Sequence, residues 1–325
     1  MAVPRRKFLH LAAGVAALPA LARGAVAADY PARPVHLICG FVAGSGSDIY
    51  ARLIAQWLSQ RLGQSVVVEN RPGAGTNVAT EAVVNAPPDG YTLLMISTAA
   101  FTNASLYDNL SFNFIRDVAP VASVARGAFV VVVNPSFAAK TVPELIAYAK
   151  ANPGKVSMAS AGTGTVTHVA GEMFKAMAGV QMVHVPYRGE PPGLTDIMGG
   201  VVQAGVFTLA GSSELIRSGK LHALGVTTAQ RSELFPDIPA VGEFLPGYEA
   251  SLWNGVGAPR DTPADVIATL NKEINAGLLD PTIKAQLATL ASFPAPMTPA
   301  EYKTVIAQET EKWGKVIRAA GIKVE

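Results

Sequence analysis

Two glycine-rich loops are the segments of this sequence best suited to binding a negatively charged group. Each loop combines glycine with small hydroxyl residues and directly precedes a stretch of helical periodicity. Unpaired backbone N–H groups and the helix dipole favour an anion at a helix N-terminus, and glycine lets a ligand approach the backbone closely. The candidate ligand-binding residues are Phe41, Ala43, Gly44, Ser45, Gly46 and Ser47 in the first loop and Ala161, Gly162, Thr163, Gly164 and Thr165 in the second.

Taken singly, either loop is equally consistent with a tight strand-to-helix turn that needs glycine for its geometry. One such loop in each half of the chain favours a carboxylate held between two facing lobes. A nucleotide phosphate fits less well. Thr167 stands where a dinucleotide-binding motif has its third glycine, and neither loop has the lysine that follows a phosphate-binding glycine pattern.

Few residues are arranged for catalysis or metal binding. Neither loop fits the Gly-x-Ser-x-Gly pattern of a nucleophile elbow, and the histidines of the mature chain lack the spacing of metal ligands. His168 falls in the first turn of the helix after the second loop, where a structural histidine is commoner than a general base. We therefore expect no catalytic residues, no metal and no cofactor, and we include His168 among the candidate ligand-binding residues.

The elements that must position these loops alternate between short β-branched strands and amphipathic helices. This alternation predicts an α/β fold with mixed sheets flanked by helices. Asp48 is expected to cap the helix after the first loop and Gly63 to end it. Thr298 begins a capping-box sequence that opens a late helix. The predicted strands cover residues 35–39, 66–68, 91–95, 129–133, 156–159 and 221–226, and the second loop leads into a helix at about 166–177.

The sequence has no internal repeat, charge block or low-complexity linker. A division into domains must then run through paired strands rather than a single tether. The candidate crossings are residues 123–128 and 247–253. We predict lobe I from residues 28–126 together with 251–325, and lobe II from residues 127–250.

Composition excludes several classes of protein. Of the 325 residues, 50% are hydrophobic and only 15% are charged, against about 25% in a typical globular protein, so the chain is neither disordered nor built around a charged surface. With 26 basic and 24 acidic residues it lacks the basic surplus that a nucleic-acid partner requires. The single cysteine, Cys39, cannot form an internal disulfide and is expected to be buried and inert.

The first 27 residues have the pattern of an export signal. Arg5-Arg6-Lys7 precedes an apolar run that ends at Ala22, and Ala25-Val26-Ala27 fits a signal peptidase site. The run of about 15 residues is shorter than the roughly 20 that span a bilayer, although an N-terminal membrane anchor is the alternative. We predict a twin-arginine-like signal peptide at 1–27, cleaved after Ala27, and a periplasmic mature protein. Sec export would use a similar signal.

Several short motifs follow one another in a specific order. They are Phe41–Asp48, VVVENRPGAG at 66–75, PDGYTLL at 88–94, ASAGTG at 159–164, His168, HVPYRG at 184–189, SGKL at 218–221 and KWGKV at 312–316. Together they resemble the Bug family, the periplasmic solute receptors of tripartite tricarboxylate transporters. The resemblance extends from about Tyr30 to the C-terminus.

The resemblance implies a two-lobed periplasmic binding protein of type II, a Venus flytrap, that acts as a monomer. It implies that backbone amides of residues 43–47 and 161–165 hold the carboxylate of a small organic ligand, with Asp48 capping its helix instead of touching the ligand. The expected partners are the membrane subunits of a tripartite tricarboxylate transporter. A carboxylate sensor for a two-component system would share all these residues, and an enzyme on the same scaffold is a third, weaker alternative.

Two departures from the family pattern bear on the ligand. Gly40 and Val42 stand where relatives commonly have prolines around Phe41, and Phe207 and Thr208 stand where relatives commonly have Asp-Asn. Phe207 and Thr208 are therefore candidate ligand-binding residues. Without a carboxylate at this position, we expect an apolar distal pocket that favours an aromatic or aliphatic mono- or dicarboxylate over an amino acid or citrate.

Overall fold

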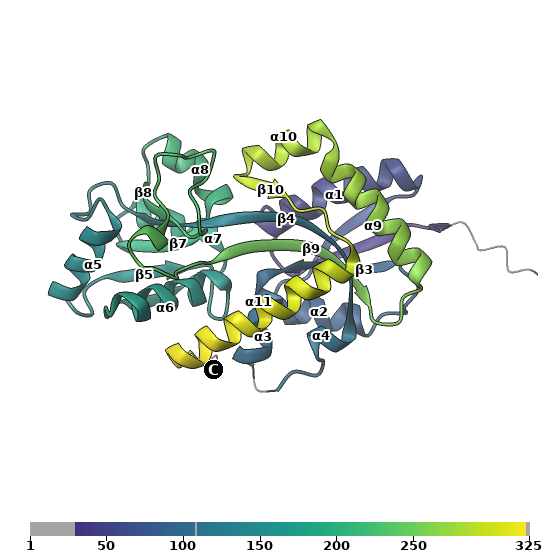
Figure 1. The fold of residues 1–325 in the computed structure, drawn as a ribbon, viewed down its shortest axis with the longest axis horizontal. Helices are drawn as coiled ribbons and strands as arrows, with labels where there is room; N and C mark the ends of the chain where they lie inside the picture. The colour runs from purple at the N-terminus through teal and green to yellow at the C-terminus, as the bar shows by residue number, and fades with distance from the viewer. Residues whose placement is uncertain (1–29, 108, 323–325) are drawn as a thin grey trace, which may run out of the picture.

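Two long antiparallel strands, β4 (Val118–Val133) and β9 (Ser251–Pro259), run through the middle of the molecule (Figure 1). The structure is a computed structural model and describes residues 30–107 and 109–322. Within them the strands form one sheet of ten, in the order β2-β1-β3-β9-β4-β7-β5-β6, with β8 and β10 each also paired to β4. The predicted signal peptide lies outside the described residues. Among the residues described, no helix has both the length and the apolar character needed to cross a membrane.

The first half of the sheet lies to the right in Figure 1. Its strands β1 and β2 are parallel, as are β1 and β3, whereas β3 runs antiparallel to β9. Its strands are β1 (Val35–Cys39), β2 (Val66–Asn70), β3 (Thr92–Ser97) and β10 (Ser292–Pro294). Its helices are α1 (Gly46–Leu62), η2 (Ala74–Thr76), α2 (Asn77–Val84), α3 (Thr98–Leu106), α4 (Phe114–Asp117), α9 (Ala264–Leu279), α10 (Pro281–Thr289) and α11 (Pro299–Ala320).

The second half of the sheet lies to the left in Figure 1. Here β5 is parallel to both β6 and β7, and β4 is antiparallel to β7 and β8. Its further strands are β5 (Ser157–Ser160), β6 (Val183–Pro186), β7 (Ala204–Thr208) and β8 (His222–Val226). Its helices are α5 (Val142–Ala151), α6 (Val166–Ala178), α7 (Glu190–Met198), α8 (Leu209–Arg217) and η3 (Val241–Glu243).

The partners of β4 change where the sequence predicts a crossing. β4 pairs with β9 as far as Ala128 opposite Ser251, and from Phe129 onward it pairs with β7 and β8 instead. The parts of β4 and β9 that cross between the halves are not loose tethers. They are paired with each other, and every residue of β9 is buried. Two continuous strands thus connect the halves, and α11 contacts both α3 and α6 beside them.

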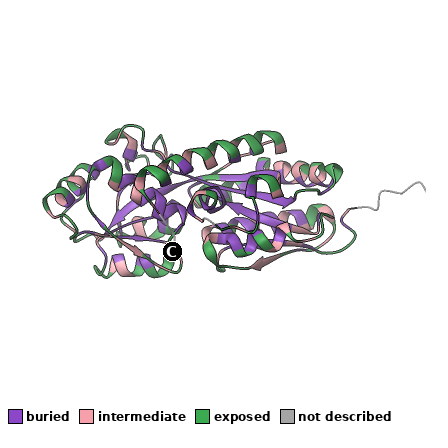
Figure 2. Ribbon diagram, turned by 90° about the horizontal axis from the view of Figure 1, so that it is seen from below, coloured by how far each residue is buried: buried purple, intermediate pink, exposed green. Residues whose placement is uncertain are grey.

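Burial follows the sheet, with the central strands buried, the edge strands β2 and β6 partly exposed and the outer helix faces exposed (Figure 2). β1 and β3 are almost fully covered, as expected for parallel strands with helices on both faces. Cys39 is buried at the end of β1, and burial raises the pKa of its thiol to about 11. The thiol is therefore protonated at neutral pH, in keeping with the expected inert role.

Most helix boundaries agree with the sequence. Gly63 ends α1 in the left-handed conformation, and Thr298 caps α11 in a full capping box with Glu301. The N-cap predicted at Asp48 is wrong. Helix α1 begins almost one turn earlier, with Ser45 as the N-cap whose hydroxyl accepts from the N–H of Asp48.

Candidate functional site

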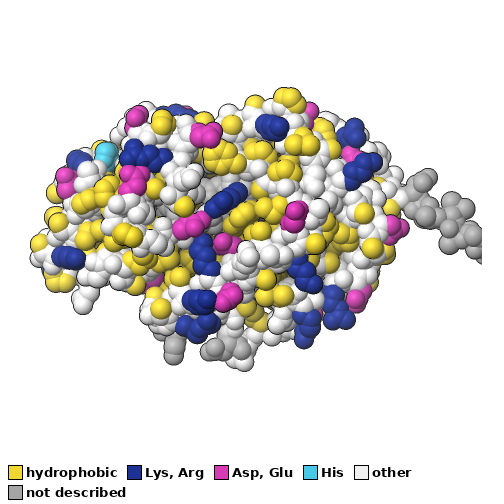
Figure 3. Space-filling view, in the orientation of Figure 1, with side chains coloured by type: hydrophobic (Ala, Val, Ile, Leu, Met, Phe, Trp, Pro, Cys, Tyr) yellow, Lys and Arg dark blue, Asp and Glu magenta, His cyan; other side chains and the backbone are white. Residues whose placement is uncertain are grey.

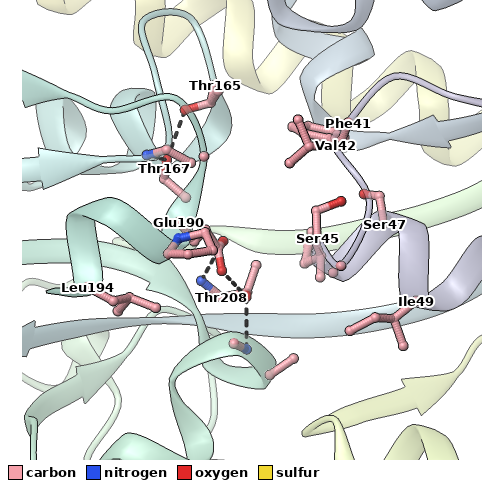
Figure 4. A pocket seen from close by; sticks show the side chains of 18 of the residues that line it. Phe41, Val42, Ser45, Ser47, Ile49, Thr165, Thr167, Glu190, Leu194 and Thr208 are labelled. Carbon is pink, nitrogen blue, oxygen red and sulfur yellow. Dashed lines mark hydrogen bonds between the residues drawn. The ribbon is translucent and has the colours of Figure 1, made fainter. Parts of the chain in front are cut away.

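A cavity of about 520 Å³ lies where the two halves of the sheet meet, and we call it the central cavity. Both predicted loops contribute to it, from opposite sides (Figure 4). Its lining also includes residues from three further helix starts and a set of apolar side chains. The lining residues from helix starts and loops are Phe41, Val42, Ala43, Gly44, Ser45, Gly46, Ser47, Ile49, Ser97, Thr98, Ala99, Ala161, Thr165, Val166, Thr167, Gly189, Glu190, Pro191, Thr208, Ala210 and Gly211.

The first loop is held by the carboxylate of Asp48. Its Oδ2 accepts from the N–H of Gly44 at 2.8 Å and from Arg52 at 2.9 Å, and its Oδ1 accepts from Asn70 at 2.8 Å. Burial alone would raise the pKa of Asp48, but these hydrogen bonds outweigh it and hold the pKa below its ordinary value. Asp48 does not line the cavity; it fixes the backbone of the residues that do.

The second loop is braced by hydroxyl groups. Thr165 caps α6 and also donates to the carbonyl of Gly162 at 2.7 Å, while Thr167 accepts from the N–H of Ala161 at 2.9 Å. Ala161, Thr165 and Thr167 line the cavity. Of the residues predicted to bind ligand in and after this loop, Gly162, Thr163, Gly164 and His168 are not part of the lining.

His168 stands behind this loop as a support. Its Nδ1 accepts from the N–H of Gly164 at 3.2 Å, and its ring stacks on His184 with 3.8 Å between centroids. His184 in turn bonds Ser160, the residue where β5 ends, at 2.7 Å. Burial lowers the pKa of both imidazoles to about 4, so both are neutral at physiological pH.

The start of helix α3 also lines the cavity, which the sequence analysis did not predict. Ser97, at the end of β3, is the N-cap residue of α3, and Ser97, Thr98 and Ala99 all line the cavity. The Ser97 hydroxyl is buried without a hydrogen-bond partner among the described residues. The same strand-to-helix reasoning that identified the two loops applies here, but Ser97-Thr98 contains no glycine and so did not stand out.

Helices α7 and α8 add a carboxyl group to the cavity wall. Glu190 is the first residue of α7, and both of its carboxyl oxygens accept from Thr208, the N-cap of α8. The distances are 3.0 Å from the Thr208 N–H to Oε1 and 2.6 Å from its hydroxyl to Oε2 (Figure 4). Burial raises the pKa of Glu190 above its ordinary value, although the Thr208 bonds favour the ionised form.

The structure corrects the prediction for Phe207. Its side chain is fully buried and lies against α7 on the side away from the cavity, where a Cβ added at Gly193 would meet the ring at 2.7 Å. Neighbouring residues of a strand point to opposite faces, so Thr208 lines the cavity and Phe207 does not. Positions 207 and 208 carry no carboxylate, as the sequence shows, but Glu190 brings one to the cavity from α7.

Five helices, α1, α3, α6, α7 and α8, thus begin at the central cavity within the described chain. Each helix N-terminus carries roughly half a positive charge and several unpaired N–H groups. No lysine or arginine belongs to the described cavity lining, whose charged members are Glu190 and Glu214. Positive potential in the cavity therefore comes from backbone dipoles.

The remaining lining is mostly apolar and comes from both halves of the sheet. It consists of Phe129, Leu194, Met198, Leu215 and Leu252, together with the polar residues Thr195 and Glu214. Such walls suit the hydrocarbon part of a small ligand, while the helix starts suit its polar groups. Within the described residues, no three histidine, cysteine or acidic side chains are grouped as metal ligands.

Comparison with known proteins gives a consistent result. Residues 50–322 match the model of the tripartite tricarboxylate transporter family receptor. Protein BugT of Bordetella pertussis is 36% identical over 304 residues, which cover 92% of this chain and 93% of BugT. The solved structure of R. palustris Rpa4515 with adipate has a TM-score of 0.87 and 34% identity, and covers 91% of this chain and 100% of that chain. For MatC of Rhodopseudomonas palustris with bound malate the TM-score is 0.83 at 27% identity, over 89% of this chain and 100% of MatC.

Proposed function

The chain belongs to the tripartite tricarboxylate transporter receptor family, and we propose that it captures a small organic carboxylate in the central cavity. It is a periplasmic solute-binding protein of the α/β type, and its family consists of transport receptors, not enzymes. Relatives of known structure hold adipate and malate, both dicarboxylates. The convergence of five helix N-termini on one cavity without a basic side chain carries the proposal.

The carboxylate would be bound by backbone N–H groups at the starts of α1, α3 and α6. These groups belong to stretches whose geometry is fixed by Asp48, Thr165 and His168. Donors held in place before the ligand arrives bind an anion without paying for their own ordering. The unpartnered Ser97 hydroxyl would supply one further hydrogen bond.

Binding would bring two lobes together. We infer that residues 28–126 with 251–325 form one lobe and residues 127–250 the other, because β4 changes partner between these groups. A ligand that contacts α1 and α6 at once binds the closed form better than an open one, and this difference in affinity drives closure. Small-angle X-ray scattering tests this: the radius of gyration should fall on saturation with a binding carboxylate.

The closed receptor would then deliver its ligand to the membrane subunits of a tripartite transporter, acting as a monomer exported with a signal peptide cut after Ala27. Its surface fits a soluble receptor of this kind. Figure 3 shows acidic and basic side chains interspersed over one face, without a patch of one sign. Mass spectrometry of the periplasmic protein gives the cleavage site, and loss of carboxylate uptake on gene deletion tests delivery.

The binding proposal is tested by placing a negative charge at the start of α1. Ser45→Asp keeps a good N-cap but puts a carboxylate into the cavity wall. Thr141→Asp makes the same exchange at the N-cap of α5, which does not line the cavity. In calorimetric titration with succinate, malate, adipate, citrate, pentanoate and 2-aminopentanoate, Ser45→Asp should weaken the best ligand at least about tenfold, since like charges in a partly buried site repel by more than 1.4 kcal/mol. Thr141→Asp should bind as the wild type does. If no carboxylate binds, or both variants bind normally, the proposal fails.

A further inference from the structure

Glu190 is a carboxyl group without a cationic partner. It lines the central cavity and takes part in none of the ion pairs of the described chain. The other acidic lining residue, Glu214, is different, because its side chain is 82% exposed and pairs with Arg217 at 2.6 Å. The charge at the cavity mouth is thus compensated, and the charge of Glu190 is not.

The hydrogen bonds around Glu190 favour an ionised carboxylate. The Thr208 hydroxyl accepts from the N–H of Gly211 at 3.1 Å, which leaves its own proton for Oε2 of Glu190. Oε1 accepts from the Thr208 N–H, so each carboxyl oxygen is an acceptor. Two neutral donors compensate a partly buried charge only in part, which is why burial still raises the pKa of this group.

The negative charge of Glu190 restricts the net charge that a bound ligand can carry. A monocarboxylate would add a second negative charge to a cavity without lysine or arginine, and a dicarboxylate would add a third. Backbone dipoles at the starts of α1, α3 and α6 can compensate one carboxylate. The start of α8 is already occupied by Glu190. A Cβ added at Gly211 would lie only 2.6 Å from its Oε2. A positive group on the ligand supplies the missing compensation.

We propose that Glu190 selects a zwitterion: a ligand whose carboxylate binds at the starts of α1, α3 and α6 and whose ammonium group pairs with Glu190. This inference rests on the proposed function, since it presumes that the cavity binds a carboxylate. The start of α1 lies close to the Glu190–Thr208 pair, because a Cβ at Gly46 would lie 4.0 Å from the Thr208 hydroxyl that bonds Glu190. Such spacing fits an α-amino acid, with its apolar side chain against Phe129, Leu194 and Leu252.

Five-carbon acids that differ only in their charged groups separate the contribution of the ammonium group from that of the carboxylate and the hydrocarbon chain. Calorimetric titration would compare pentanoate, 2-aminopentanoate, 5-aminopentanoate and pentanedioate against the wild type, Glu190→Gln, Glu190→Asp and Glu233→Gln. Glu233 is exposed and outside the cavity, so its variant matches the loss of one charge. We expect 2-aminopentanoate to bind the wild type at least about tenfold more tightly than pentanoate. Glu190→Gln should abolish that advantage and strengthen pentanedioate, Glu190→Asp should retain part of it, and Glu233→Gln all of it.

Other outcomes overturn the inference. If pentanoate or pentanedioate binds the wild type as well as the amino acids do, or if the preference for 2-aminopentanoate survives in Glu190→Gln, Glu190 does not select a cation and the proposed carboxylate receptor still stands. Tighter binding of pentanedioate by the wild type than by Glu190→Gln would mean that Glu190 donates a proton to a second carboxylate. If no acid binds any variant, the proposed function fails together with this inference. Circular dichroism and the melting temperature verify that each variant is folded.

Discussion

Gly164 donates its backbone N–H to Nδ1 of His168 at 3.2 Å, one turn into the helix that follows. An imidazole can accept at Nδ1 only while that nitrogen is unprotonated. Burial first, and then the nearby Lys175, lower the pKa of His168 to about 4, and the stacked His184 is lowered to about 4 as well. Glu172 lies 3.8 Å from Nε2 of His168, but it is paired with Lys175 at 2.7 Å. The second loop therefore depends on a neutral histidine pair.

This pair predicts loss of stability in mild acid. The unfolded chain takes up protons at histidine below a pH of about 6.5, whereas the folded pair stays neutral until about pH 4. The contribution of the neutral histidine pair to the free energy of unfolding is thus complete above pH 6.5 and is lost as the pH falls toward 4. Melting temperatures measured from pH 7.5 to 4.5 should decline through this window.

Two substitutions test whether the acid sensitivity comes from His168. His168→Asn keeps an oxygen that can accept from Gly164 but removes one titrating group, so its melting temperature should decline less steeply with pH. His222→Asn, on β8, should follow the wild-type profile. A decline equally steep in His168→Asn and the wild type would assign the acid sensitivity to other groups.

The buried ring of Phe207 predicts a separation of stability from binding. Phe207→Leu leaves a void in the fully buried cluster beside α7 and should cost about 1–3 kcal/mol of unfolding free energy. Phe207→Asp should not fold, because the carboxylate would be buried without a partner. Leu194→Ala, in the same cluster but lining the cavity, should in addition weaken ligands with apolar chains. A change of ligand preference in Phe207→Leu, measured by calorimetry, would contradict this assignment.

The error at Phe207 shows where reading the sequence fails. Every residue of β7 is buried, so the alternation of polar and apolar residues that reveals the two faces of a strand is absent there. In contrast, the α1 and α6 loops were found because glycine and hydroxyl residues mark them locally. The short apolar strands also follow from local patterns, whereas their order in the sheet is set by contacts between segments far apart in the chain and was not predicted.

Glu190 was missed for a different reason. Its significance depends on Thr208, 18 residues further along the chain, and on the absence of a basic side chain from the lining of the cavity. Neither is visible until β7 and α7 are placed side by side. Ser97 likewise resembles any serine at the end of a strand until the structure places the residue in the cavity lining with its hydroxyl buried and without a partner in the described chain.

The Asp48 network predicts that the first loop can be loosened from behind. Asp48→Asn removes the charge from three hydrogen bonds and should cost about 1–3 kcal/mol of stability, with weaker ligand binding because Gly44 loses a strong acceptor. Asp117→Asn is the matched control, since Asp117 also accepts from a backbone N–H and an arginine, far from the cavity lining. It should lower the melting temperature without changing the dissociation constant. Equal affinity in both variants would show that the first loop keeps its shape without Asp48.

Ser97 gives the most selective test of the cavity. Its hydroxyl is buried without a partner in the described structure, so Ser97→Ala removes an unsatisfied polar group and should leave stability unchanged or slightly higher. If the hydroxyl bonds the ligand, the same variant should weaken binding by about 0.5–1.5 kcal/mol, or roughly two- to tenfold. Ser123→Ala is the control, because Ser123 is buried and unpartnered on β4 but does not line the cavity. It should match Ser97→Ala in thermal unfolding and the wild type in calorimetric titration. Equal affinity for Ser97→Ala and Ser123→Ala would place the ligand away from the start of α3 and limit its anion contacts to α1 and α6.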